Sequence, residues 1–82
     1  MKLSEKIKVS FIQLGLHIRM LREKRQLSLK ELSKITGIRK EYLSKIEQGN
    51  AYGILIERHL FKIAKSFDIK LSELLDFEDI DI

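Results

Sequence analysis

The segment GIRKEYLSKIEQGN, residues 37–50, decides the fold because a helix-length apolar stripe stands between two glycines. Its apolar residues recur at spacings of three and four, so they share one side of a helix: Ile38, Tyr42, Leu43 and Ile46. The opposite side is polar and partly basic, with Lys40, Glu41, Ser44 and Gln48. Such a helix buries one face and leaves a charged face for a partner.

The start of this helix lacks the kind of residue that usually caps one. Ser, Thr, Asp or Asn is preferred there, because a side-chain oxygen accepts a hydrogen bond from the first free N–H groups. The chain instead has Arg39 followed by Lys40, and two cations at this end oppose the helix dipole. An anion bound at this end would offset the unfavourable charge. The segment therefore predicts a helix start that faces a negatively charged partner.

The same helical spacing continues on both sides of this segment and predicts an all-α chain, since no run alternates as a strand does. We expect five helices, at about residues 4–24, 29–36, 40–48, 54–67 and 70–76. Gly15 leaves open whether the first is one helix or two. Ser28 and Glu31 form an S-x-x-E capping box for the second helix, and Gly37 provides the left-handed residue that ends it.

Composition favours a small, folded, soluble domain. The chain has 82 residues, of which 44% are hydrophobic and 34% charged, too apolar a mixture for a disordered segment. It has no Cys, which excludes disulfides and thiolate metal sites, and no apolar run approaches the roughly 18 residues of a membrane span. The first residues are too mixed for a secretory signal. We therefore expect a cytoplasmic protein without membrane association.

Charge is distributed unevenly along the chain. Residues 19–48 contain nine Lys and Arg against four Asp and Glu, whereas residues 49–82 contain four against seven. A basic middle indicates one anion-facing surface, although a solvated helical surface would have the same charges. His17 and His59 lack neighbours at metal-ligand or catalytic spacing. No enzymatic activity, metal or cofactor is expected.

At this point the chain resembles a known family. LGLHIRMLREKRQLSLKELSKITGIRKEYLSKIEQGN and KIAKSFDIKLSELL are similar to the phage repressor and Cro-type (XRE-like) helix-turn-helix family. The resemblance covers residues 14–75 and implies a compact five-helix lambda-repressor-like domain that binds double-stranded DNA through its third helix. Residues 1–13 would extend the first helix, and residues 76–82 would form an acidic tail.

The resemblance also implies roles for individual residues. The base-reading residues would be Lys40, Glu41, Ser44 and Lys45, since Lys can donate to guanine and Glu can accept from cytosine. The phosphate contacts would be Ser28, Lys30 and Arg39. Arg22 would pair with Glu47 and tie the first helix to the third. The alternative for the exposed charged residues is an ordinary solvated helix face.

These roles imply a sequence-specific transcription regulator, a repressor that binds a palindromic operator as a homodimer. The candidate dimer surfaces are a stripe from Leu3 to Ile12 and the apolar residues beyond the needs of a small core: Phe61, Phe77, Ile80 and Ile82.

Several positions depart from the family pattern. Leu29 stands where Gln is common, Ser33 where Ala is usual, and Thr36 where Leu or Val is usual. LSL at residues 27–29 with Thr36, IRKEYL at residues 38–43 and the longer loop after Gly49 are similar to the helix-turn-helix subclass of the cell-shape protein RodZ, which binds an actin-like filament protein. The alternative function is therefore a protein-interaction module without specific DNA recognition. An antitoxin role, which would also require a protein partner, remains open.

Overall fold

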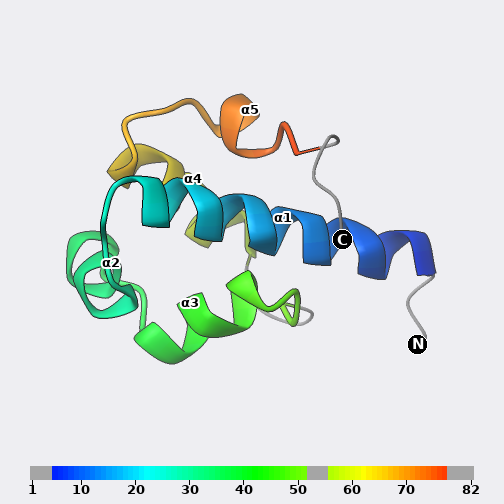
Figure 1. The fold of residues 1–82 in the computed structure, drawn as a ribbon, viewed down its shortest axis with the longest axis horizontal. Coiled ribbons are helices and arrows are strands. Elements are labelled where there is room, and N and C mark those ends of the chain that lie inside the picture. Colours follow the sequence, from blue (N-terminus) through cyan, green and yellow to red (C-terminus); the bar gives the residue numbers. More distant parts are fainter. Residues whose placement is uncertain (1–4, 52–55, 78–82) are drawn as a thin grey trace.

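The computed structural model describes residues 5–51 and 56–77 and contains five helices within them. They are α1 (Glu5–Lys24), α2 (Leu29–Thr36), α3 (Lys40–Glu47), α4 (Ile56–Ser66) and α5 (Leu71–Leu74), arranged as Figure 1 shows. No strand occurs in the described ranges, and the predicted all-α fold class is confirmed. The fifth helix is shorter than predicted, with four residues in place of about seven.

The long helix α1 is unbroken, so a division at Gly15 is wrong. Gly15 is buried where α1 crosses the C-terminal end of α3. A Cβ atom at this position would lie 2.4 Å from the carbonyl oxygen of Ile46 and 2.5 Å from that of Glu47. Both distances are shorter than a non-bonded carbon and oxygen atom can tolerate. Glycine is present here because two backbones approach closely.

Helix α2 begins and ends as local sequence rules predict. The Ser28 Oγ atom accepts a hydrogen bond from the Glu31 N–H at 3.0 Å, and the Glu31 carboxylate accepts one from the Ser28 N–H at 3.0 Å. The backbone N–H of Ser28 stabilises the charged carboxylate and holds the pKa of Glu31 below its ordinary value. Gly37 ends the helix at φ 75°, in the left-handed region. The capping box and the glycine stop are confirmed.

The hydrophobic core draws on every helix. Most of the apolar residues whose helical spacing points inward in and next to α1, α3 and α4 are buried: Leu14, Ile18, Ile38, Leu43, Ile46, Leu60, Ile63, Ala64 and Phe67. Leu32 of α2 and Leu74 of α5 are buried with them. Tyr42, placed by spacing on the same stripe of α3, stands instead at the edge of the core, where its ring stacks on that of His59 at 6.1 Å. The side chains of Leu55 and Ile56, also expected inside, lie outside the described residues.

The apolar residues predicted to lie outside the core differ in how deeply they are buried. Phe77 packs against the core, with its ring centroid 6.5 Å from that of His17, so it is not a surplus residue. Phe61 is 60% exposed on the outer face of α4. Ile80, Ile82 and the N-terminal part of the Leu3–Ile12 stripe lie outside the described side chains. Of the predicted surplus, Phe61 remains as an exposed apolar side chain.

Polar side chains connect α1 and the residue that follows it to the C-terminal part of the domain. Arg25 donates hydrogen bonds to the carbonyl oxygens of Leu21 at 2.9 Å and Phe67 at 3.0 Å, and its guanidinium lies 4.7 Å from the centre of the Phe67 ring. The Nδ1 atom of His17 lies 2.8 Å from the carbonyl oxygen of Leu74. In Figure 1, α4 lies partly behind α1 and α5 lies above it, whereas α2 and α3 lie on the lower side.

Candidate nucleic-acid interface

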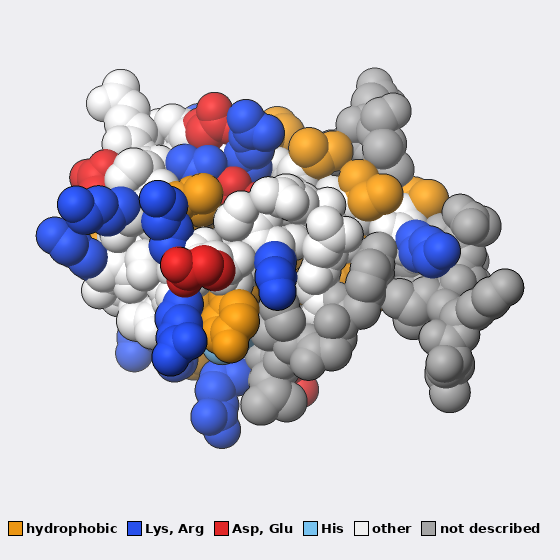
Figure 2. All heavy atoms as spheres, turned by 90° about the horizontal axis from the view of Figure 1, so that it is seen from below, with side chains coloured by type: hydrophobic (Ala, Val, Ile, Leu, Met, Phe, Trp, Pro, Cys, Tyr) orange, Lys and Arg blue, Asp and Glu red, His pale blue; other side chains and the backbone are white. Residues whose placement is uncertain are grey.

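Helices α2 and α3 pack against each other and are joined by the three residues 37–39. On α3, Leu43 and Ile46 are buried, while the side chains of Lys40, Glu41 and Lys45 are exposed. This arrangement is a helix-turn-helix, in which the second helix can enter the major groove of DNA. Figure 2 shows Lys and Arg side chains gathered on this face over α2 and α3.

The four residues expected to read bases all belong to α3, but they are not equally available. Lys40, Glu41 and Lys45 are exposed. Ser44 is half-buried, and its Oγ atom accepts a hydrogen bond from the side chain of Gln48 at 2.8 Å. Its hydroxyl hydrogen can still be donated, so Ser44 and Gln48 would meet a base edge as a connected pair.

The three residues expected to touch phosphates lie around the start of α2 and the start of α3. Lys30 and Arg39 are exposed. Ser28 is exposed as well, but its Oγ atom already caps α2. Arg39 is the N-cap residue of α3 at φ −58° and ψ 139°, and its side chain makes no capping hydrogen bond. The start of α3 is therefore uncapped, as its sequence indicates.

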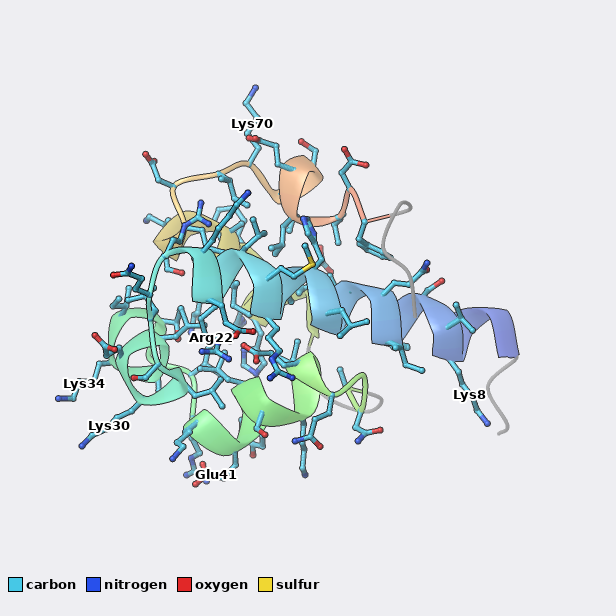
Figure 3. The ribbon with its side chains drawn as sticks, viewed as in Figure 1. Lys8, Arg22, Lys30, Lys34, Glu41 and Lys70 are labelled. Atoms are coloured by element: carbon cyan, nitrogen blue, oxygen red, sulfur yellow. The ribbon has the colours of Figure 1, made fainter. Side chains whose placement is uncertain are left out.

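One cation of this face was not identified from the sequence. Lys34 is exposed on α2 one turn after Lys30, and both project from the same side of the molecule as Glu41 (Figure 3). The four-residue spacing of Lys30 and Lys34 is the signal that could have revealed the pair. Together with Arg39 and Lys40, these lysines give the exposed face a positive field that favours a polyanion.

A buried ion pair connects α1 to α3 behind this face. The Arg22 Nε atom lies 2.7 Å from Glu47 Oε2 and its Nη2 atom 3.0 Å from Oε1, while Nη1 donates to the carbonyl oxygen of Leu27 at 2.7 Å. The two charged side chains are 12% and 6% exposed. The hydrogen bonds to Glu47 raise the pKa of Arg22. This pair, which the family resemblance implied, holds the C-terminal end of α3 in place.

Two hydroxyls near the C-terminal end of α2 form hydrogen bonds that the sequence did not predict. Ser33 Oγ donates to the carbonyl oxygen of Ile38 at 2.6 Å. Thr36 Oγ1 donates to the carbonyl oxygen of Leu32 at 2.8 Å and accepts from the Ile38 N–H at 3.2 Å. Both positions were noted only as departures from the family pattern. Their hydrogen bonds are formed at the turn itself.

Both histidines pack against other parts of the domain. The His17 ring lies against the carbonyl oxygen of Leu74, and His59, a residue of α4, is half-buried against the ring of Tyr42. Within the described ranges no protein atom hydrogen-bonds the buried Nδ1 atom of His59. Burial, reinforced by the nearby charges of Lys62 and Arg58, lowers the pKa of His59 below its ordinary value.

This lowered pKa predicts how stability depends on pH. The unfolded chain binds a proton at His59 more readily than the folded domain, so the contribution of His59 is complete above about pH 6.5 and is lost as the pH falls below it. We expect the His59→Gln protein to lose less stability than the wild type when the pH falls through this range. Thermal unfolding of both proteins between about pH 7.5 and about pH 5.5 measures it. An equal decrease in both would contradict the assignment.

The described residues contain no group of three metal-ligating side chains. None of the described helices is both long enough and apolar enough to span a membrane. What this face offers chemically is a set of Lys and Arg donors for phosphates, with Lys, Glu and Ser side chains on α3 for base edges.

Comparison with known proteins agrees with this geometry. The sequence profile of the Cro/C1-type helix-turn-helix DNA-binding domain matches residues 17–79. The structure is similar to the crystal structure of the restriction-modification controller protein C.AhdI from Aeromonas hydrophila, with a TM-score of 0.73 and 27% sequence identity over 80% of this chain and 97% of that one. Comparison with curated proteins gives no match. The chain belongs to the family of Cro/C1-type helix-turn-helix DNA-binding domains.

Proposed function

We propose that the protein is a sequence-specific transcription regulator, a repressor that binds a palindromic operator as a homodimer. The observation that carries the proposal is the exposed face of α3 in a helix-turn-helix. This face carries Lys40, Glu41 and Lys45, and the helix begins without a side-chain cap. The likeness to a restriction-modification controller protein supports a regulatory role. Lys30, Lys34 and Arg39 would neutralise phosphates, and α3 would read bases.

Selection from a random pool of double-stranded DNA tests this function. We expect a palindromic motif to be enriched, with half-sites about one helical turn, or about 34 Å, apart. Lys40→Ala should weaken binding to some sequences more than to others, because a base-reading side chain contributes to discrimination. If no motif is enriched at moderate salt, specific recognition is ruled out. If Lys40→Ala weakens binding equally for all sequences, the side chain contacts phosphates and does not read bases.

Arg39→Ser should change stability and DNA binding in opposite directions. Serine at the N-cap would accept a hydrogen bond from a free N–H group of α3 and stabilise the free domain by about 1 kcal/mol. The same change removes a phosphate contact, which should weaken binding to all sequences and reduce the salt dependence by about one counterion. Urea unfolding measures the first effect, and titration of DNA at several salt concentrations measures the second.

Lys70→Ser is the matched control for this prediction. Lys70 is also a cationic N-cap residue without a side-chain cap, at the start of α5, but it projects from the side of the molecule opposite Lys30, Lys34 and Glu41 (Figure 3). This control should stabilise its helix without weakening DNA binding. If Arg39→Ser leaves binding unchanged, the start of α3 faces something other than DNA.

A homodimer would place two α3 helices on successive turns of one DNA face. Phe61 on α4 supports self-association, because it is the most exposed of the large apolar side chains described. Sedimentation of the wild-type protein with and without operator DNA measures the oligomeric state. A protein that stays monomeric on its operator would contradict the dimer.

The described residues offer little support for a protein-interaction module in place of DNA recognition. Leu29 packs against the core and Thr36 is buried, so neither departure from the family pattern presents a surface to a partner. The loop that suggested the same subclass lies largely outside the described residues.

A further inference from the structure

The backbone of Ile38 is held by side chains on both of its polar groups. Its carbonyl oxygen accepts a hydrogen bond from Ser33 Oγ at 2.6 Å, and its N–H donates to Thr36 Oγ1 at 3.2 Å. Both hydroxyls come from the last two turns of α2, and Thr36 is itself anchored to the carbonyl oxygen of Leu32. The side chain of Ile38 is 2% exposed. Residue 38 is therefore fixed by its backbone as well as by its side chain.

The chain continues directly from this residue into α3. The carbonyl oxygen of Arg39, the next residue, accepts the first helical hydrogen bonds of α3, from the N–H groups of Tyr42 at 3.0 Å and Leu43 at 3.1 Å. The Arg39 side chain contributes no cap. The direction of the first turn of α3 is consequently set from the α2 side, by the atoms that hold Ile38.

We propose that Ser33 and Thr36 are positioning residues for DNA recognition, whose hydroxyls fix the direction in which α3 leaves the turn and so set sequence discrimination. The inference rests on the proposed function, since it concerns the accuracy with which Lys40, Glu41 and their neighbours meet base edges. Hydrogen bonds to bases are lost when donor and acceptor move apart by up to about one ångström. The attraction between Lys and phosphate tolerates such shifts. A loosened turn should therefore weaken operator binding more than binding to unrelated DNA.

Pairing of buried polar groups is the simpler explanation for these hydrogen bonds, because an unpaired N–H or carbonyl in the interior is unfavourable in any protein. That role alone would lower the stability of a variant without changing the discrimination of its folded molecules. The two explanations thus differ in one measurable ratio, the affinity for operator divided by the affinity for unrelated DNA.

Four variants separate them. Thr36→Val keeps the shape of the side chain and removes both hydrogen bonds, whereas Thr36→Ser keeps the hydroxyl. Ser33→Ala removes the bond to the Ile38 carbonyl at a half-buried site, and Ser72→Ala removes an exposed hydroxyl of α5 as a control. The operator is the sequence selected by the wild-type protein. Binding is measured at low temperature, where circular dichroism shows each variant to be folded.

We expect Thr36→Val and Ser33→Ala each to lower the affinity ratio about tenfold, a loss comparable to that of one base contact, with Thr36→Ser and Ser72→Ala close to the wild type. If Thr36→Val does not fold, Ser33→Ala and Thr36→Ser still decide the outcome. An unchanged ratio in folded Ser33→Ala, together with wild-type selection of an operator, overturns this inference alone. A wild-type protein that selects no operator overturns the proposed function and this inference together.

Discussion

Gly15→Ala is expected to destabilise the domain by about 2 kcal/mol, although alanine is the better helix former. The added Cβ atom would stand 2.4 Å from the Ile46 carbonyl oxygen and 2.8 Å from the carbonyl carbon of Glu47. These are backbone atoms, so α1 and α3 must move apart to make room. In a helix without this contact, the same substitution would stabilise by about 1 kcal/mol. The sign of the change therefore tests the contact directly, and urea unfolding measures it.

Met20→Ala is the control on the same helix. Met20 is 56% exposed, so its replacement should change the free energy of unfolding by at most about 0.5 kcal/mol. Because the movement forced by Gly15→Ala also displaces the C-terminal end of α3, operator binding should weaken in the folded variant. A Gly15→Ala protein more stable than the wild type would show that α1 and α3 do not meet at this position.

Glu47→Ala is expected to cost about 3 kcal/mol, a large share of the stability of a domain of this size. It would leave the largely buried Arg22 guanidinium with the Leu27 carbonyl oxygen as its one remaining hydrogen-bond partner among the described residues, and with Glu23 as a more distant opposite charge. An unpaired buried charge costs far more than the pair contributes when complete. Glu47→Gln, which keeps the shape and one acceptor oxygen, should cost less. Chemical denaturation of the two variants and the wild type gives the comparison.

An exposed ion pair on α1 provides the matched control. Arg19 Nε lies 2.9 Å from Glu23 Oε1, close to the Arg22–Glu47 distance. The side chains of Arg19 and Glu23, however, are 59% and 56% exposed. Solvent screens such a pair, so Glu23→Ala should cost at most about 0.5 kcal/mol. Equal losses for Glu23→Ala and Glu47→Ala would mean that burial does not set the cost at Glu47.

These contacts explain how an eight-residue helix without a capping side chain keeps its place. Helix α3 is held at its C-terminal end by the Gly15 approach and by Arg22, and at its N-terminal end by the hydroxyls that bind Ile38. A recognition helix fixed at both ends can leave its outer face entirely to charged and polar residues. Under the proposed function, that face determines affinity and discrimination without an adjustment of the helix on binding.

Local sequence was sufficient to predict most of the fold. Helix spacing located the buried stripes, Ser28 and Glu31 marked the start of α2, and Gly37 its end. Each of these depends on residues within about four positions of one another, because helix hydrogen bonds and caps are local. The uncapped start at Arg39 was visible for the same reason. The family resemblance, and not the spacing, supplied the Arg22–Glu47 pair and the roles on α3.

The sequence by itself determined the number of helices, most of their ends and most of their apolar sides. The tertiary structure decided what single residues do where helices meet. Gly15 does not break α1, because the backbone at the end of α3 packs against it. Tyr42 lies at the edge of the core, where its ring stacks on His59 of α4. Ser33 and Thr36 stabilise the turn because their hydroxyls form hydrogen bonds with the backbone of Ile38. In each case the outcome depends on atoms from another part of the chain, whose positions are set by the packing of the whole domain.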